Sequence, residues 1–159
     1  AQMASDKAIR EVEMVMSSLN KKAKEVVDGY PVNACTDITG FGLLGHCVEM
    51  AEASEVTFNL NVHDIAYFDE AIAYAKMGLV PAGAYKNRGY SQMKVDMGNV
   101  EEHFIDLLYD PQTSGGLLLS VEPQYVEVIM ETFEKKHMET KVSIIGTVEE
   151  KSDKLIRLH

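Results

Sequence analysis

The chain has 159 residues, of which 46% are apolar, and its 15 Lys and Arg against 25 Asp and Glu give a formal net charge of -10. This length and composition predict one domain that buries about 70% of its unfolded surface, and the acidic balance excludes the cationic surface that nucleic-acid binding needs. No apolar run approaches the roughly 20 residues that span a bilayer. Two cysteines and no apolar N-terminal segment of the signal-peptide type favour a cytoplasmic protein that does not enter membranes.

The first half of the chain alternates between helical and strand periodicity. Apolar residues at helical spacing and stop signals such as Gly29 and Pro31 mark the helices, and strict alternation marks the clearest strand. The predicted elements are helices over 6–19, 21–27, 41–53 and 65–77 and strands over 32–38 and 56–62.

The second half begins with residues 79–100, which keep neither period for long and predict a long loop, with a hinge near 80–90. The predicted elements after it are a helix over 101–109, a strand over 117–121, a helix from Pro123 to Phe133, and two strands within 141–158 joined near 151–153. Crossovers followed by a terminal hairpin predict an α/β fold, with helices covering a mixed β-sheet.

The stretch TDITGFG, residues 36–42, runs from a strand through a turn into a helix. The free amides of residues 39–42 would face one small volume and favour an anion by about 0.3 to 1 kcal/mol. Asp37 opposes a bare phosphate by about 1 kcal/mol in water, whereas Mg²⁺ held between Asp37 and phosphate oxygens would reverse the sign. The alternative is that Asp37 or Thr39 only caps the helix.

The other polar candidates carry weaker signals. His46 and Cys47 project about 100° apart on a helix and no C-x-x-C pair exists, so a zinc site is not expected; Cys47 suits the core and Cys35 an inert strand thiol. His63 and Asp64 resemble a catalytic pair in type but lack a third partner.

The segment DPQTSGG, residues 110–116, offers several donors in a row, including Thr113 and Ser114. It fits an anion-binding turn, but the sequence favours an ordinary structural turn, because Asp-Pro and Gly-Gly are common turn formers.

Three stretches, ACTDITGFGLLGH at 34–46, GLVPAGAYKNR at 78–88 and DPQTSGGLLLSV at 110–121, resemble the C-terminal domain of the selenophosphate synthetases, also called selenide, water dikinases. The resemblance runs in order along nearly the whole chain. It implies a three-layer α/β/α fold like that of the C-terminal domain of aminoimidazole ribonucleotide synthetase. It also implies that residues 1–159 are the second domain of a two-domain subunit whose N-terminal domain is absent.

The resemblance further implies a reaction in which ATP, selenide and water give selenophosphate, AMP and phosphate with Mg²⁺. Asp37 matches the metal-binding aspartate of the second domain, and Thr36, Thr39 and Gly40 would lie near the ATP phosphates. The missing domain would supply the reactive Cys or selenocysteine, a lysine, most of the ATP pocket and the homodimer contact. No catalytic residue is therefore expected in this chain, which would be inactive alone.

Two alternatives stay open from the sequence. One is a non-catalytic binding or regulatory module that reuses the fold. The other is a related ATP-dependent synthetase of the same superfamily.

Overall fold

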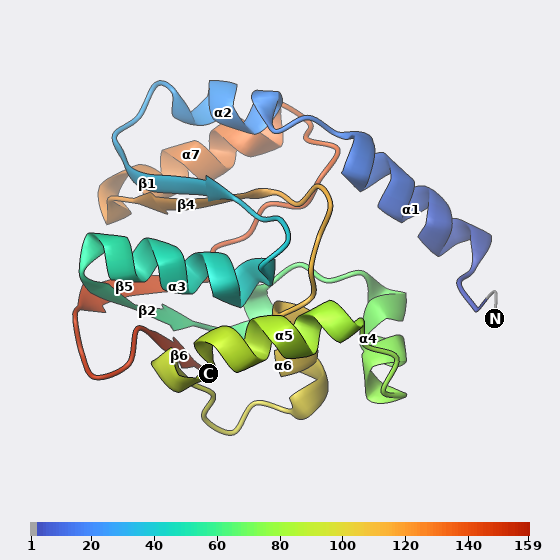
Figure 1. Cartoon of the computed structure of the whole chain (residues 1–159). Coiled ribbons are helices and arrows are strands. Elements are labelled where there is room, and N and C mark those ends of the chain that lie inside the picture. Colours follow the sequence, from blue (N-terminus) through green and yellow to red (C-terminus); the bar gives the residue numbers. More distant parts are fainter. Residues whose placement is uncertain (1–2) are drawn as a thin grey trace.

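A computed structural model describes residues 3–159. Seven helices, two short 3-10 turns and six strands alternate along this part of the chain (Figure 1). In chain order they are α1 (Asp6–Ser17), α2 (Lys21–Val27), β1 (Val32–Asp37), α3 (Gly42–Ser54), β2 (Val56–Leu60), η1 (Val62–Asp64), α4 (Asp69–Lys76), α5 (Ala82–Ser91), η2 (Gln92–Lys94), β3 (Val95–Asp96), α6 (Glu102–Leu108), β4 (Leu117–Val121), α7 (Pro123–Lys135), β5 (Gly146–Glu150) and β6 (Ile156–Leu158). None of these helices has the length and apolarity needed to cross a bilayer.

The strands form two sheets. β1 pairs antiparallel with β4, so that Asp37 lies opposite Leu117. The second sheet has the order β3-β6-β2-β5, with β2–β5 antiparallel and both β2–β6 and β3–β6 parallel. The predicted α/β class with a mixed sheet is confirmed.

The predicted terminal hairpin is wrong, because β5 and β6 lie on opposite sides of β2 and do not pair with each other. Buried Thr57 explains the route of the connection: its hydroxyl oxygen accepts from the Ser152 N–H at 2.9 Å and donates to the Lys154 carbonyl at 2.8 Å. These bonds hold the connecting segment at β2, and the chain passes to the other edge of that strand before β6 begins.

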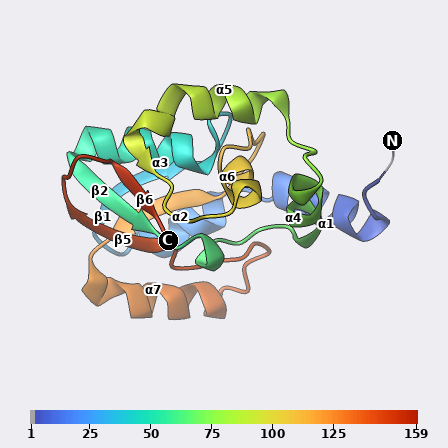
Figure 2. The same cartoon turned by 90° about the horizontal axis from the view of Figure 1, so that it is seen from below.

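The helices cover the strands on two sides (Figure 2). α3 packs on β1, β2 and β6 and also contacts α5 and α6, so these three helices form one layer. α2 and α7 contact each other on the other side, where Val26, Val27, Ile129 and Phe133 form a second, smaller core. The arrangement agrees with the predicted three layers.

Two predictions for the middle of the chain differ from the structure. The helix expected over 65–77 begins only at Asp69 and ends at Lys76. The expected loop over 79–100 is wrong, because this segment contains the ten-residue helix α5, followed by η2 and β3. Pro81 supplies the extended residue before α5, and Gly83 sits inside the helix because a Cβ there would lie 2.8 Å from the Pro111 ring.

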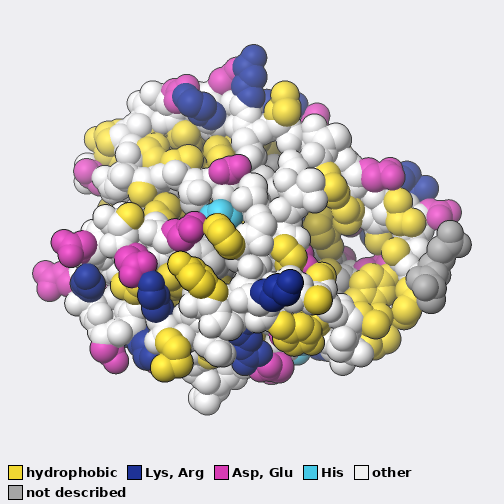
Figure 3. All heavy atoms as spheres, viewed as in Figure 1, with side chains coloured by type: hydrophobic (Ala, Val, Ile, Leu, Met, Phe, Trp, Pro, Cys, Tyr) yellow, Lys and Arg dark blue, Asp and Glu magenta, His cyan; other side chains and the backbone are white. Residues whose placement is uncertain are grey.

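α1 extends away from the body of the molecule (Figure 1). It contains no buried residue. Hydrophobic side chains are exposed along it and on the surface beside it (Figure 3). The large apolar side chains exposed on α1 or directly after it are Ile9, Met14, Met16 and Leu19.

Candidate functional site at the end of strand β1

Asp37 is the last residue of β1, and its side chain is exposed. Within residues 3–159 its carboxylate accepts no hydrogen bond and forms no ion pair, so it caps neither α3 nor the turn. The next residue, Ile38, is buried, and its backbone is fixed to the DPQTSGG segment, residues 110–116. Its N–H donates to Gly116 O and its carbonyl accepts from Gly115 N, both at 2.9 Å. The carboxylate therefore belongs to a residue whose C-terminal neighbour is fixed by two backbone hydrogen bonds.

The turn after Asp37 commits some of its amides and leaves others free. Thr39 N–H donates to His46 Nε2 at 3.1 Å, and Gly42 N–H donates to the Thr39 carbonyl at 3.0 Å. In the described part of the chain, the N–H groups of Gly40 and Phe41 donate to no protein acceptor. Two of the four amides expected to face a ligand are thus already used, and two remain available.

Thr36 and Asp37 lie on opposite faces of β1, because side chains alternate along a strand. The burial pattern places Thr36 on the half-buried face with Ala34, and Asp37 on the exposed face with Cys35. The Thr36 hydroxyl lies 3.3 Å from the Asp37 carbonyl oxygen, to which it donates. Thr36 is therefore close to Asp37 in sequence without its hydroxyl sharing the face of the carboxylate.

The three stretches that carry the family resemblance meet at this turn. Asn87 of α5 donates through its side-chain amide to Gly40 O at 2.9 Å and to Tyr109 O at 3.0 Å. Gln112 N–H donates to Thr39 O at 3.1 Å. The middle stretch thus contacts the first through Asn87, and the third stretch contacts the first through Gln112.

Gly42 allows this close approach. Its φ of +70° lies in the left-handed region, and a Cβ there would lie 2.7 Å from the carbonyl carbon of Tyr109. A side chain at residue 42 would therefore be strained and would also push the end of α6 away from the turn.

The pKa values of Cys35 and Cys47 argue against a reactive role for either thiol. Burial raises the pKa of Cys47 to about 12. The pKa of Cys35 is also raised, first by partial burial and then by the negative charge of Asp37, with Lys24 acting in the opposite direction. A raised pKa leaves less thiolate at neutral pH, which is the reverse of what a nucleophilic cysteine needs.

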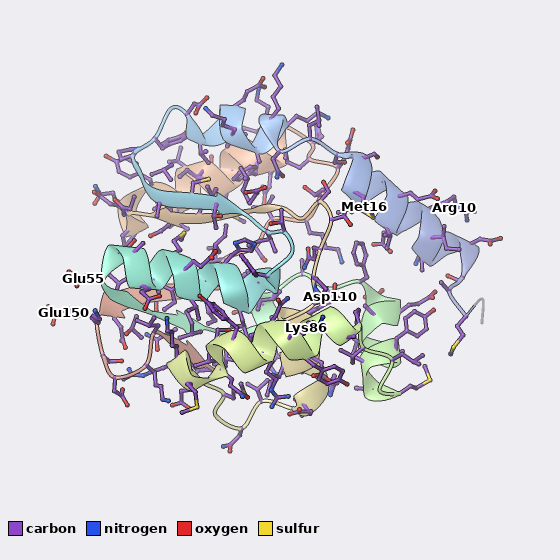
Figure 4. All side chains as sticks on the ribbon, viewed as in Figure 1. Arg10, Met16, Glu55, Lys86, Asp110 and Glu150 are labelled. Carbon is purple, nitrogen blue, oxygen red and sulfur yellow. The ribbon has the colours of Figure 1, made fainter. Side chains whose placement is uncertain are left out.

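The DPQTSGG segment contains another carboxylate. Asp110, at the end of α6 in the turn that faces α5, is half-buried, and burial raises its pKa (Figure 4). In the same turn Thr113 is exposed and Ser114 is half-buried; neither side chain has a hydrogen-bond partner in the described part of the chain.

The remaining candidates do not form sites. Asp64 accepts from the Asn61 side chain at 2.7 Å, and the His63 ring stands edge-on to Phe104 with centroids 5.2 Å apart, so His63 and Asp64 do not act as a hydrogen-bonded pair. Among residues 3–159 no three His, Cys, Asp or Glu side chains lie close enough together to hold a metal ion.

Sequence reasoning missed two residues of this site. His46 was considered only as a zinc ligand, although its ring accepts the Thr39 amide hydrogen. Asn87 gave no signal, because the two carbonyls that it contacts are 47 and 22 residues away in the chain.

A family model described as AIR synthase related protein, C-terminal domain, matches residues 2–158. The chain therefore belongs to this family, as the resemblance of the three stretches implied.

Several curated relatives of this chain are selenide, water dikinases. The chain is 45% identical over 146 residues to selenide, water dikinase 2 of Peptoclostridium acidaminophilum, which covers 92% of this chain and 42% of that protein. It is 43% identical over 157 residues to selenide, water dikinase of Clostridium botulinum (strain Alaska E43 / Type E3), covering 98% of the chain and 45% of that protein. The corresponding protein of Clostridioides difficile (strain 630) is 44% identical over 156 residues, covering 98% and 43%. The chain thus spans less than half the length of these relatives.

Proposed function

We propose that this chain is the C-terminal domain of a two-domain selenophosphate synthetase, which converts ATP, selenide and water into selenophosphate, AMP and phosphate. The names and extents of the matched relatives support this proposal, because the chain aligns almost completely with less than half of each selenide, water dikinase. The remaining half would carry the reactive residue and most of the ATP pocket. The isolated chain is then inactive, and the full-length enzyme is a cytoplasmic homodimer.

The observation that carries a role for this domain is the exposed carboxylate of Asp37, which has no partner within residues 3–159 and precedes by three and four residues the N–H groups of Gly40 and Phe41, which also have none there. A carboxylate about 4 Å from one phosphate charge is repelled by about 1 kcal/mol in water and by more where water is excluded. Two free amides do not offset that repulsion against a triphosphate. The arrangement therefore suits a nucleotide whose phosphates arrive with a divalent cation.

The residues present fit one part of a Mg²⁺ site. Mg²⁺ binds oxygen ligands and commonly takes one or two carboxylates together with phosphate oxygens and waters. Asp37 would supply one carboxylate, and further ligands would come from the nucleotide and the missing half. When bound, the ion would neutralise phosphate charge during phosphoryl transfer.

Of the other residues expected near the phosphates, Gly40 has an N–H that donates to no acceptor within residues 3–159. Thr39 would contribute only through its hydroxyl, because its N–H is donated to His46. This chain's part in catalysis is then to orient the nucleotide and to hold one ligand of the ion in place.

The test is Asp37→Ala and Asp37→Asn in the full-length protein, with Glu127→Ala as a control that removes one exposed carboxylate from α7. We expect ATP- and selenide-dependent release of AMP to fall about 100-fold or more in both Asp37 variants, the size seen when one electrostatic stabiliser is removed. The Glu127→Ala variant should match the parent. Normal turnover in Asp37→Ala would contradict the proposed role.

Isothermal titration of the isolated chain with Mg-ATP separates the enzyme fragment from a binding module. We expect no measurable heat of binding, since one carboxylate does not hold the ion alone. Clear affinity would favour the binding or regulatory module.

A further inference from the structure

His46 is nearly enclosed, with 8% of its surface exposed, and both of its ring nitrogens have partners. Nε2 lies 3.1 Å from Thr39 N and 3.2 Å from Thr39 Oγ1, and Nδ1 lies 3.2 Å from Glu49 Oε2, one turn further along α3. The Phe41 ring packs beside the imidazole with centroids 5.6 Å apart. The imidazole therefore joins the first turns of α3 to the turn that follows Asp37.

The partners of His46 decide which nitrogen carries the hydrogen. A backbone N–H can only donate, so Nε2 must present its lone pair to Thr39. The ring hydrogen is then on Nδ1, where it points to the Glu49 carboxylate. Glu49 thus favours the one neutral tautomer that can accept from Thr39, as an orienting carboxylate does for a metal-bound histidine.

We propose that His46 is a positioning residue for the Asp37 carboxylate, with Glu49 fixing its tautomer. Thr39 is two residues from Asp37, and the intervening Ile38 is bonded on both sides to Gly115 and Gly116. Asn87 holds the following carbonyl, that of Gly40. His46 supplies the acceptor inside this turn; without it, the half-buried Thr39 N–H loses its partner and the turn reorients to recover one.

The consequence for activity rests on the proposed function of Asp37. A displacement of about 1 Å in a positioned group lowers a rate by up to about 100-fold. We expect His46→Leu in the full-length enzyme to lower kcat by 10- to 100-fold and to raise the Mg²⁺ concentration needed for half-maximal turnover. His46→Gln should recover most of both, because its side-chain oxygen can accept from Thr39.

The geometry itself is tested on the chain alone by ¹⁵N NMR. Long-range ¹H–¹⁵N spectra should show His46 with hydrogen on Nδ1 and none on Nε2. The Thr39 amide should exchange at least 10-fold more slowly in the parent and in His46→Gln than in His46→Leu. Glu49→Ala should increase the population of the other tautomer, whereas Glu52→Ala, which removes a carboxylate paired with Lys94, should not.

The outcomes are distinguishable. Hydrogen on Nε2 in the parent chain, or an equally fast Thr39 amide in all variants, overturns the inference without reference to activity, and the parent spectrum needs no variant to fold. If Asp37→Ala abolishes turnover while folded His46→Leu keeps normal kcat and Mg²⁺ dependence, the positioning role is wrong and the proposed function stands. If Asp37→Ala keeps turnover, the proposed function fails, and so does the catalytic role of His46. A lower Tm with unchanged Mg²⁺ dependence would reduce His46 to a structural residue.

Discussion

α3 and α1 both have apolar residues at helical spacing, but only α3 is buried in the folded domain. α3 lies against both sheets and α5, and most of its residues are buried. α1 has no buried residue. Hydrogen bonds hold its two ends, from Ser5 to Glu70 and from Ser18 to Glu139. The comparison shows that an amphipathic pattern identifies an apolar face without identifying what covers it.

The largest expected contrast comes from removing one leucine from each region. Leu44 of α3 is 0% exposed and Leu19, just after α1, is 77% exposed. We expect Leu44→Ala to lower the free energy of unfolding by about 2 to 5 kcal/mol, and Leu19→Ala to change it by less than about 0.5 kcal/mol. Urea unfolding of the isolated chain, followed by circular dichroism, measures both. A loss in Leu19→Ala as large as that in Leu44→Ala would show that the end of α1 is covered in solution.

The turn that leads into α3 offers a second matched pair. Gly42→Ala should lower the free energy of unfolding by about 3 kcal/mol, because the new Cβ combines a strained backbone with overpacking against Tyr109. Gly40→Ala, where no atom lies within 4 Å of the added Cβ, should cost less than about 1 kcal/mol. Equal losses in the same urea experiment would mean that the turn relaxes around residue 42.

The smallest effect is expected at α1. The Ser5 side chain accepts from Ala8 N–H at 3.1 Å and donates to the Glu70 carboxylate, so Ser5→Ala removes both a helix cap and a contact with α4. We expect about 1 kcal/mol of local stability to be lost, seen as faster hydrogen exchange in the first turns of α1 with little change in the urea midpoint. Ser17→Ala, at the other end of the helix, is the control. Unchanged exchange in Ser5→Ala would show that the cap does not hold α1.

Lowering the pH tests the same contact between Ser5 and Glu70. Hydrogen bonds from Ser5, and then from Tyr74, lower the pKa of Glu70 below its usual value. A lowered pKa means that the contact is fully present above the unfolded value of about 4.3 and is lost as the pH falls through the lower folded value. Protection of the α1 amides should therefore fall below about pH 4. Glu70→Gln should weaken this pH dependence, and an unchanged profile in that variant would assign the effect to another group.

Local patterns predicted the elements that are both regular and long enough to show their period. The helix over 21–27, the strand over 117–121 and the start of α7 at Pro123 agree with the structure, because caps, stops and alternation act within one element. α5 was missed because Gly83 and Gly89 read as loop residues, whereas Gly83 is required by the approach of Pro111.

Pairings between distant segments had no local signal. The sequence could not show that β6 crosses to the far side of β2, since that route depends on buried Thr57 and a connection almost 100 residues away. The site divides in the same way. Asp37 and its exposed position at a strand end could be predicted from its motif, but the contacts of His46 and Asn87 with the turn appear only in the folded chain.

The bonds among residues 38–40, Asn87, Gln112 and the two glycines at 115 and 116 all lie within this chain. The turn that presents Asp37 is therefore formed by contacts within this chain. On the two-domain organisation proposed above, separately produced halves would recombine by rigid docking, without the delay and the ordering entropy of refolding this surface.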